Sequence, residues 1–294
     1  MKKLFAFFLF VTCYTVHAQN PAAYKIYNSK GKSVSYKKMI KKLDKADIMC
    51  FGELHNNSIA HWLQFEITKS LNTNNDLILG AEMIERDNEK VFQQYMRDEI
   101  DAKALDTLAR LWNNFDTDYK PLVDYAKVNG IEYFSTNIPR RFASLVYRQD
   151  FKGLESLTKE EKSWIAPLPI AFDISLPGYK KMLSMGGGMS HGGENFPKAQ
   201  AIKDATMAHF IMENYEANHL FIHLNGSYHS DNHGEIIGEG IIWYMKKISP
   251  ELNYMNITTV EQDDINKLSK DHLGKADFII CVPSNMTKTY TFSF

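Results

Sequence analysis

Two glutamates and two histidines stand where short apolar runs of this sequence end. They are Glu53 and His55 after the run 48–51, Glu82 at the end of the run 77–82, and His229 shortly after the run 219–225. Runs that stay apolar without alternating are typical of strands buried on both faces of a parallel sheet. The four polar side chains should therefore meet at the carboxyl edge of one sheet, where ligands bind in open α/β folds.

These four side chains suit a hydrolytic centre. We expect Glu53 and Glu82 on adjacent strand ends, where two close carboxylates raise one pKa and lower the other, giving a proton acceptor and a donor. His55 would serve as general base toward water, or all four residues would hold a divalent metal that activates the water. The sequence has no HExxH metal motif. The alternative is that the cluster only braces buried loops through hydrogen bonds.

Strand-like and helix-like segments alternate along the whole chain, and no internal repeat or linker interrupts them. This alternation predicts an α/β fold, a central and largely parallel sheet flanked by helices on both faces. The predicted strands are 48–53, 77–82, 131–137, 219–225, 254–261 and 278–283. The predicted helices are 58–71, with Ser58 near the N-cap, 88–96, 119–128, 140–147, 197–215 and 239–248. Several strands close on a carboxylate or amide: Glu53, Glu82, Asn137, Asn225 and Glu261.

One segment, about 166–195, departs from this alternation and is rich in glycine and methionine. It contains Tyr179, Lys180, Lys181 and His191, together with Met182, Met185 and Met189. We interpret it as a helical, Gly/Met-rich insertion near the site, either a mobile lid or a segment that orders around a ligand. A plain surface loop is the alternative.

The amino terminus indicates export. Two lysines precede an apolar run from Leu4 to about Val16, and Ala18 ends a small-residue cleavage site. We therefore predict a signal peptide over 1–18, a single domain over 19–294, and a periplasmic or membrane-associated product. Cys13 follows Thr12, where lipidation signals prefer a smaller residue. Ordinary cleavage is favoured, with lipidation of Cys13 as the alternative.

The charge balance and the two remaining cysteines bear on possible partners and on disulfide bonds. The chain has 34 Lys and Arg against 35 Asp and Glu, which gives no broad attraction to nucleic acid. Cys50 and Cys281 lie in apolar runs and are expected to be small buried hydrophobic residues; a disulfide between them is the alternative.

Several blocks, taken in order, resemble the ChaN-like haem-binding proteins, an iron-regulated bacterial family. The blocks are FGELHNNSIAHWLQ at 51–64, LGAEM at 79–83, the run from Trp112 through YKPLVDYA to NIPRR at 137–141, AQAIKDATMA at 199–208 and NGSYH at 225–229. The sequence departs from the family after His229, where SDNHGEIIGEG stands in place of a basic, Val-Pro-containing stretch.

The resemblance implies haem held between two monomers, with a tyrosine oxygen on iron and histidine and lysine side chains near the propionates. It also implies kinship with TIKI metalloproteases and erythromycin esterases. A phenolate suits hard ferric iron. Tyr179, beside Lys180, is the first candidate ligand, and Tyr228, beside His229, is the second. Histidines are alternatives, namely His191, His209 and His233, and Met182 is a candidate to line the porphyrin.

We therefore expect an exported protein of iron or haem uptake that binds b-type haem non-covalently at the carboxyl edge of the sheet, as a homodimer. Outer-membrane haem-uptake machinery is a candidate partner. We expect binding to be its function in place of catalysis; an enzyme of this sequence would be a hydrolase. The alternative functions are a metal-dependent hydrolase, peptidase or esterase, built on Glu53, His55, Glu82 and His229, and an accessory protein whose pocket has lost its ligand.

Overall fold

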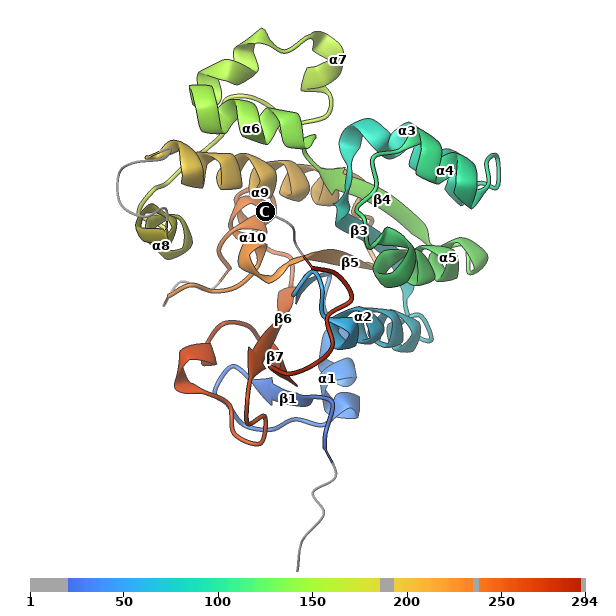
Figure 1. The fold of residues 1–294 in the computed structure, drawn as a ribbon, viewed down its shortest axis with the longest axis vertical. Helices are drawn as coiled ribbons and strands as arrows, with labels where there is room; N and C mark the ends of the chain where they lie inside the picture. The colour runs from blue at the N-terminus through green and yellow to red at the C-terminus, as the bar shows by residue number, and fades with distance from the viewer. Residues whose placement is uncertain (1–20, 186–192, 235–237, 292–294) are drawn as a thin grey trace, which may run out of the picture.

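A seven-stranded sheet in the order β1-β7-β6-β2-β5-β3-β4 forms the centre of the computed structural model (Figure 1). The structure describes residues 21–185, 193–234 and 238–291, so the predicted signal peptide and His191 lie outside it. Every strand pair is parallel except β1 with β7. The strands are β1 Lys25–Asn28, β2 Ile48–Glu53, β3 Asp76–Glu85, β4 Glu132–Asn137, β5 His219–Gly226, β6 Tyr254–Gln262 and β7 Phe278–Pro283. The predicted α/β class is confirmed.

Helices cover both faces of this sheet (Figure 1). They are α1 Tyr36–Leu43, α2 Ser58–Leu71, α3 Glu89–Met96, α4 Ala102–Leu108, α5 Lys120–Val128, α6 Arg140–Gln149, α7 Lys159–Lys162, α8 Pro177–Met185, α9 Asn195–Asn214 and α10 Ile241–Ile248. Each predicted strand and helix is present, with ends shifted by a few residues. The elements β1, α1, α4 and α7 were not predicted. Of these, β1 and α7 have four residues each, too few to show a period. Helix α8 lies within the predicted insertion.

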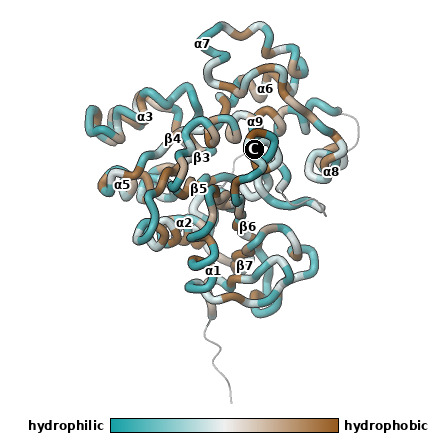
Figure 2. The backbone as a smooth tube through the Cα atoms, turned by 180° about the vertical axis from the view of Figure 1, so that it is seen from behind, coloured by the Kyte–Doolittle hydropathy of each residue, from teal (hydrophilic) through white to brown (hydrophobic). Residues whose placement is uncertain are grey.

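Strand β2 shows why a central strand is apolar at every position. Its residues Met49 and Phe51 pack in the core on the side of α2, whereas Ile48 and Cys50 pack on the side of α9 and α10. Since successive side chains of a strand point to opposite faces, two apolar faces require a run without alternation. Hydrophobic residues accordingly lie along the strands and their covering helices, whereas α7 is mainly hydrophilic (Figure 2).

The strand order corrects one expectation. Strands β2 and β3, which carry Glu53 and Glu82, are not neighbours, because β5 lies between them and pairs with both. Pairing order depends on how the crossover helices pack and leaves no local pattern in the sequence. The buried thiols are free, with Cys50 on β2 and Cys281 on β7 separated by β6. Within the described ranges, no helix is long and apolar enough to cross a membrane.

Candidate ligand-binding site

Glu53 is the buried centre of the first strand end. Its side chain is fully enclosed, and three donors reach its carboxylate. The Tyr119 hydroxyl donates at 2.7 Å and the Gln64 amide at 2.6 Å. The third partner is the His55 Nδ1 atom, 2.8 Å from Glu53 Oε1. A carboxylate with several charge-assisted bonds is held as an anion in one orientation. Glu53 therefore fixes the direction of the His55 ring.

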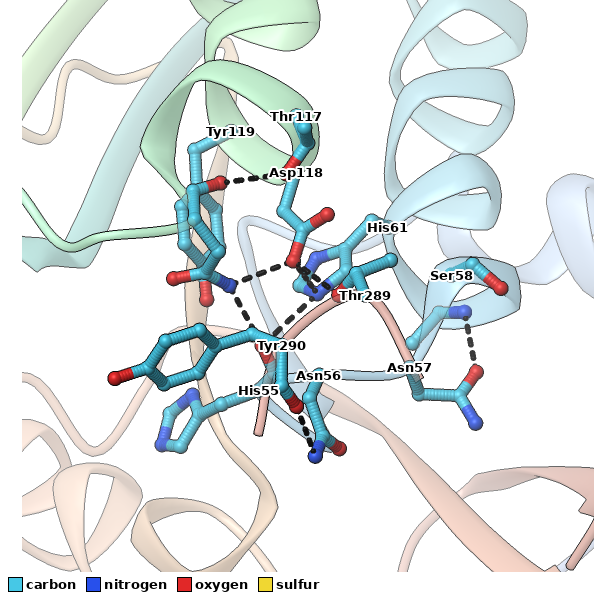
Figure 3. Close-up of polar contacts among 12 residues, drawn as sticks. His55, Asn56, Asn57, Ser58, His61, Thr117, Asp118, Tyr119, Thr289 and Tyr290 are labelled. Atoms are coloured by element: carbon cyan, nitrogen blue, oxygen red, sulfur yellow. Dashed lines mark hydrogen bonds and ion pairs between the residues drawn. The ribbon is translucent and has the colours of Figure 1, made fainter. Parts of the chain in front are cut away.

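The loop that carries His55 is fixed from two sides. Asn57 caps α2 by accepting bonds from the amides of Ile59 and Ala60, so the cap lies one residue before the predicted Ser58. The carboxyl-terminal segment crosses over the same loop (Figure 3). There the Asn56 side chain donates to the Tyr290 carbonyl at 2.9 Å, and the Thr289 amide donates to the Asn56 carbonyl at 3.0 Å.

A buried histidine, His61, links this loop to the segment before α5 (Figure 3). Its Nδ1 atom lies 3.4 Å from Glu53 Oε2, and its Nε2 atom lies 3.3 Å from Asp118 Oδ2. Burial lowers the pKa of His61, but the charges of Glu53 and Asp118 outweigh burial and raise it to about 9. His61 is therefore a buried cation at neutral pH, and it holds Glu53 ionised.

The second strand end, on β3, has a network of its own. Glu82 accepts a bond from the Gly226 amide at 2.7 Å, and its Oε1 lies 3.1 Å from His229 Nε2. The other nitrogen of His229 is 2.5 Å from Asp204 Oδ1 on α9. The Tyr179 hydroxyl donates to the remaining oxygen of Asp204 at 2.7 Å. Glu82, His229, Asp204 and Tyr179 thus form one buried chain of hydrogen bonds.

Both glutamates are held in the charged form, which corrects the expectation of one raised and one lowered pKa. Burial raises the pKa of Glu53, but the imidazoles of His61 and His55 outweigh it and lower the pKa to about 2. Burial likewise raises the pKa of Glu82, but the charge of His229 outweighs burial and lowers the pKa of Glu82 below its ordinary value. The pKa of His229 is lowered by burial and raised more strongly by Glu82 and Asp204, to about 9. Each carboxylate has an imidazole partner, so the two do not compete for one proton.

His55 lies between the two networks. A side chain at position 226 would place its Cβ 2.7 Å from His55 Nε2, so Gly226 is what leaves room for the ring. Trp112 meets the ring edge to face, with centroids 4.8 Å apart. Burial lowers the pKa of His55, but hydrogen bonding to Glu53 and the charge of Glu82 raise it above its ordinary value.

A cleft of about 1280 Å³ opens over this carboxyl edge, and His55 and Glu82 form part of its wall. Its apolar wall consists of Leu111, Trp112, Ile138, Ala143, Tyr147, Phe196 and Ala199. Its charged side chains are Glu85, Asp87, Arg110, Arg140, Arg141 and Lys203. The cleft lies at the edge of the sheet where the sequence predicts a ligand site, although most of its wall comes from α6, α9 and the segment around residue 111.

The predicted iron ligands lie beside this cleft and do not line it. Tyr179 is buried with its hydroxyl on Asp204, and the Tyr228 hydroxyl donates to the Gly178 carbonyl at 2.9 Å. Tyr179, Tyr228 and His233 line a separate cavity of about 10 Å³, the size of one water molecule. Met182 is buried next to Tyr179, and Lys180 is exposed. Ligation by either tyrosine stays a prediction, and it requires that hydroxyl to leave its present acceptor.

Several members of the buried networks were not predicted from the sequence, namely His61, Gln64, Asp118, Tyr119 and Asp204. A signal for His61 and Gln64 was available, because both lie among the buried positions of α2 together with Leu63 and Ile67. A polar residue on the apolar face of a helix needs a buried partner. Asp204 is likewise buried on α9, among alanines and Met207.

Two observations bear on hydrolytic chemistry. In the part of the chain that the structure describes, no group of three or more His, Cys, Asp and Glu side chains is placed to hold a metal ion. The pentapeptide GMSHG at 188–192 has the G-x-S-x-G spacing of a serine-hydrolase elbow, which sits between a strand and a helix. It lies outside the described residues and follows helix α8, so the chain does not show that strand–helix context.

Comparison with known proteins gives a family and a fold. Residues 39–245 match the family described as haem-binding uptake, Tiki superfamily, ChaN. The structure of ChaN of Campylobacter jejuni, solved for cofacial haem binding, is 18% identical with a TM-score of 0.63. The alignment covers 87% of this chain and 96% of that one.

Two other solved structures are more distant. A Bacillus cereus protein is 12% identical over 89% of this chain and 95% of that one, with a TM-score of 0.49. An erythromycin esterase mutant in its open conformation is 10% identical over 90% and 98%, with a TM-score of 0.48. No curated protein matches the chain.

Proposed function

We propose that this chain, which belongs to the ChaN family of haem-binding uptake proteins in the Tiki superfamily, binds haem non-covalently in the cleft over the carboxyl edge of its sheet. The observation that carries the proposal is the composition of the cleft wall. Aromatic and aliphatic side chains are combined there with four cations, of which Arg140 and Lys203 have no ion-pair partner among the described residues. A haem needs both kinds of contact, because its porphyrin is apolar and its two propionates are anionic.

The cleft suits haem in size and in its donor set. Its volume of about 1280 Å³ exceeds the roughly 300–1,000 Å³ of pockets for drug-sized molecules. Trp112 and Phe196 can contact porphyrin faces, and Arg140 and Lys203 can meet carboxylates. His55 reaches the same wall with a carboxylate behind its ring, an arrangement typical of histidines that bind metals. Bound haem would supply a ferric iron that can coordinate an oxygen or nitrogen ligand.

The identity of the axial ligand is open to a direct test. Tyr179→Phe and Tyr228→Phe should each be compared with His55→Ala in the haem-loaded protein. Loss of a high-spin charge-transfer band in one tyrosine variant identifies that phenolate as the ligand. A band that persists in both tyrosine variants and changes only in His55→Ala assigns the iron to His55.

We propose further that the protein is exported, acts in iron or haem uptake, and binds haem as a homodimer. The apolar run near the amino terminus supports export. Cofacial haem binding in a structure that shares this fold supports a two-subunit site. A ligand that prefers the dimer shifts the equilibrium toward it.

Titration of ferric haem into the mature protein tests the main proposal. A saturable shift of the haem absorbance, with a fixed stoichiometry, is the expected result. Ser144 lies on α6 in the cleft wall, so Ser144→Trp should fill the cleft and weaken binding. Ser163→Trp, at an exposed position beyond α7, is the matched control. The proposal fails if haem does not bind saturably, or if Ser144→Trp binds haem as tightly as the control.

A hydrolase is the second candidate function, and the orientation of His55 favours it. A histidine whose Nδ1 is held by a buried carboxylate is positioned to accept a proton at Nε2. The raised pKa of His55 works against this role at neutral pH, because a protonated ring cannot act as a base. Esterase or peptidase activity that disappears in His55→Ala would support this alternative.

A further inference from the structure

We propose that a second, basic face of the protein docks on the surface of an anionic phospholipid bilayer. This face, the α1 groove, lies between helix α1 and the start of β6 and has a volume of about 380 Å³. The residues that line it are Lys38, Lys41, Lys42, Lys45, Asn253 and Met255. The inference goes beyond haem binding, because the α1 groove shares no residue with the cleft.

The four lysines lie along one side of α1 and of the turn that follows it. Each is three or four positions from two of the others, a spacing that makes residues neighbours on a helix surface. All four are exposed, whereas Met39 and Leu43 are buried on the other side of the helix. Like charges at this spacing repel. The helix dipole favours cations in the last turn, at Lys41 and Lys42, but it does not account for Lys38.

No carboxylate pairs with these lysines. None of the four makes an ion pair or donates a side-chain hydrogen bond to any residue that the structure describes. Lys42 Nζ lies 5.9 Å from the centre of the Phe278 ring, at the outer limit of a cation–π contact. The whole chain carries nearly equal numbers of basic and acidic residues, 34 and 35. The α1 groove is therefore a local excess of positive charge.

The nearest carboxylates are already bound within the protein. Asp47 accepts a hydrogen bond from the Asn253 amide at 2.7 Å. Asp277 accepts one from the Asn256 amide at 3.0 Å. Burial raises the pKa of Asp277, and the charge of Lys42 opposes that rise, so the two groups are within electrostatic reach without forming an ion pair. The exposed ammonium groups thus keep their charge available for an external anion.

The α1 groove lies at the amino edge of the sheet, whereas the cleft lies at the carboxyl edge. Lys45 stands shortly before β2 and Asn253 directly before β6, and the Asn253 side chain donates to the Lys45 carbonyl at 2.7 Å. In Figure 1, α1 is at the bottom of the molecule, and α6 and α9, which line the cleft, are at the top. A bilayer on the α1 groove would therefore leave the cleft open to solvent.

The amino-terminal end of the described chain lies on the same side as α1. The Val34 amide, just before α1, donates to the Ile26 carbonyl of β1 at 2.8 Å. The predicted signal peptide, 1–18, comes shortly before β1 in the sequence. A lipid on Cys13, the alternative to ordinary cleavage, would tether the protein at this end. Both proposals for the amino terminus therefore agree with a membrane next to α1.

Charge complementarity and the choice of lysine identify the occupant. A lysine ammonium is a point charge on a flexible stem, without the fixed fork by which arginine selects one phosphate geometry. Four lysines and no arginine line the α1 groove, which suits a fluid layer of headgroups better than a single ligand. Each lysine near an anionic bilayer strengthens binding about fivefold, so the four together give roughly several hundred-fold.

Vesicle flotation of the mature protein tests the inference. The vesicles are pure phosphatidylcholine or phosphatidylcholine mixed with phosphatidylglycerol. The parent should bind the anionic vesicles about a hundred-fold more tightly than the neutral ones, and high salt should remove the difference. A variant with all four lysines of the α1 groove replaced by glutamine should lose this preference. Arginine at the same four positions should keep it, because the charge is retained.

A matched control changes the net charge equally at another part of the surface. It replaces four exposed lysines outside the α1 groove with glutamine, namely Lys90, Lys103, Lys152 and Lys159. This variant should bind anionic vesicles as the parent does.

Three results would overturn the inference. The parent could fail to distinguish the two kinds of vesicle, or the control could lose as much binding as the α1-groove variant. Binding of inorganic polyphosphate without binding of vesicles would assign the α1 groove to a soluble polyanion. If the fourfold variant does not fold, the double variant Lys38→Gln with Lys41→Gln takes its place, and full binding by that variant counts against the inference. No haem is present in this assay, so its result does not depend on the proposed function.

Discussion

Replacing Glu53 with glutamine tests whether the buried network at the end of β2 holds the fold together. An amide keeps one acceptor oxygen, which can still serve Tyr119 and His55. Its NH₂ group then faces the Gln64 amide, whose nitrogen lies 2.6 Å from Glu53 Oε2. Two donors would meet, and one buried group would stay unpaired. That alone costs about 1–3 kcal/mol.

The lowered pKa of Glu53 gives a second estimate of the free energy of unfolding that the variant should lose. It falls from 4.5 to about 2, which corresponds to about 3 kcal/mol of stability at pH 7. The direction of the pKa shift decides how stability changes with pH. A lowered carboxyl pKa stabilises the fold above the unfolded value of 4.5, and this contribution is lost as pH falls toward 2. About 1 kcal/mol should remain at pH 3.

Thermal and urea unfolding of the parent and Glu53→Gln at pH 7 and pH 3 provide the assay. The variant should melt about 6 °C lower at pH 7, and the difference should shrink by more than half at pH 3. Glu160→Gln, which changes an exposed carboxylate on α7, is the control and should leave the melting temperature unchanged. The reasoning is refuted if Glu53→Gln loses less than about 1 kcal/mol at pH 7, or if its loss does not depend on pH.

Three further predictions concern the histidines and the assembly. The raised pKa values of His61 and His229, both about 9, stabilise the fold fully below pH 6.5, so stability should fall between pH 6.5 and 9. In His229→Asn the free energy of unfolding should fall by about 3 kcal/mol less than in the parent over this pH range. An equal fall in parent and variant would contradict the prediction. Light scattering should show a dimer at saturating haem, whereas an unchanged monomer mass would exclude haem-promoted assembly. His55→Ala should abolish any hydrolytic turnover and leave haem affinity nearly unchanged if His55 is a general base; loss of haem binding instead would make it a haem contact.

Local sequence patterns were sufficient to predict most strands and helices of the fold. The strand 48–53 and the helix 58–71 were predicted with their observed bounds, because burial on both faces and a regular apolar spacing leave a signal within a few residues. The polar strand ends Glu53 and Glu82 were predicted for the same reason. The short edge strand β1 was missed, since four residues carry no readable period.

The sequence by itself thus determined the α/β class, the strands and helices that position the site, and the edge of the sheet where polar residues gather. Only the tertiary structure decided that β5 separates Glu53 from Glu82, that each glutamate has its own imidazole, and that Tyr179 donates to Asp204. It also brought Arg140 and Lys203 to one cleft from helices far apart in the chain. The physical reason is the separation of the interacting residues along the chain. Periodicity and helix capping depend on residues close in sequence, whereas strand order, buried ion pairs and cleft walls arise from contacts between distant segments.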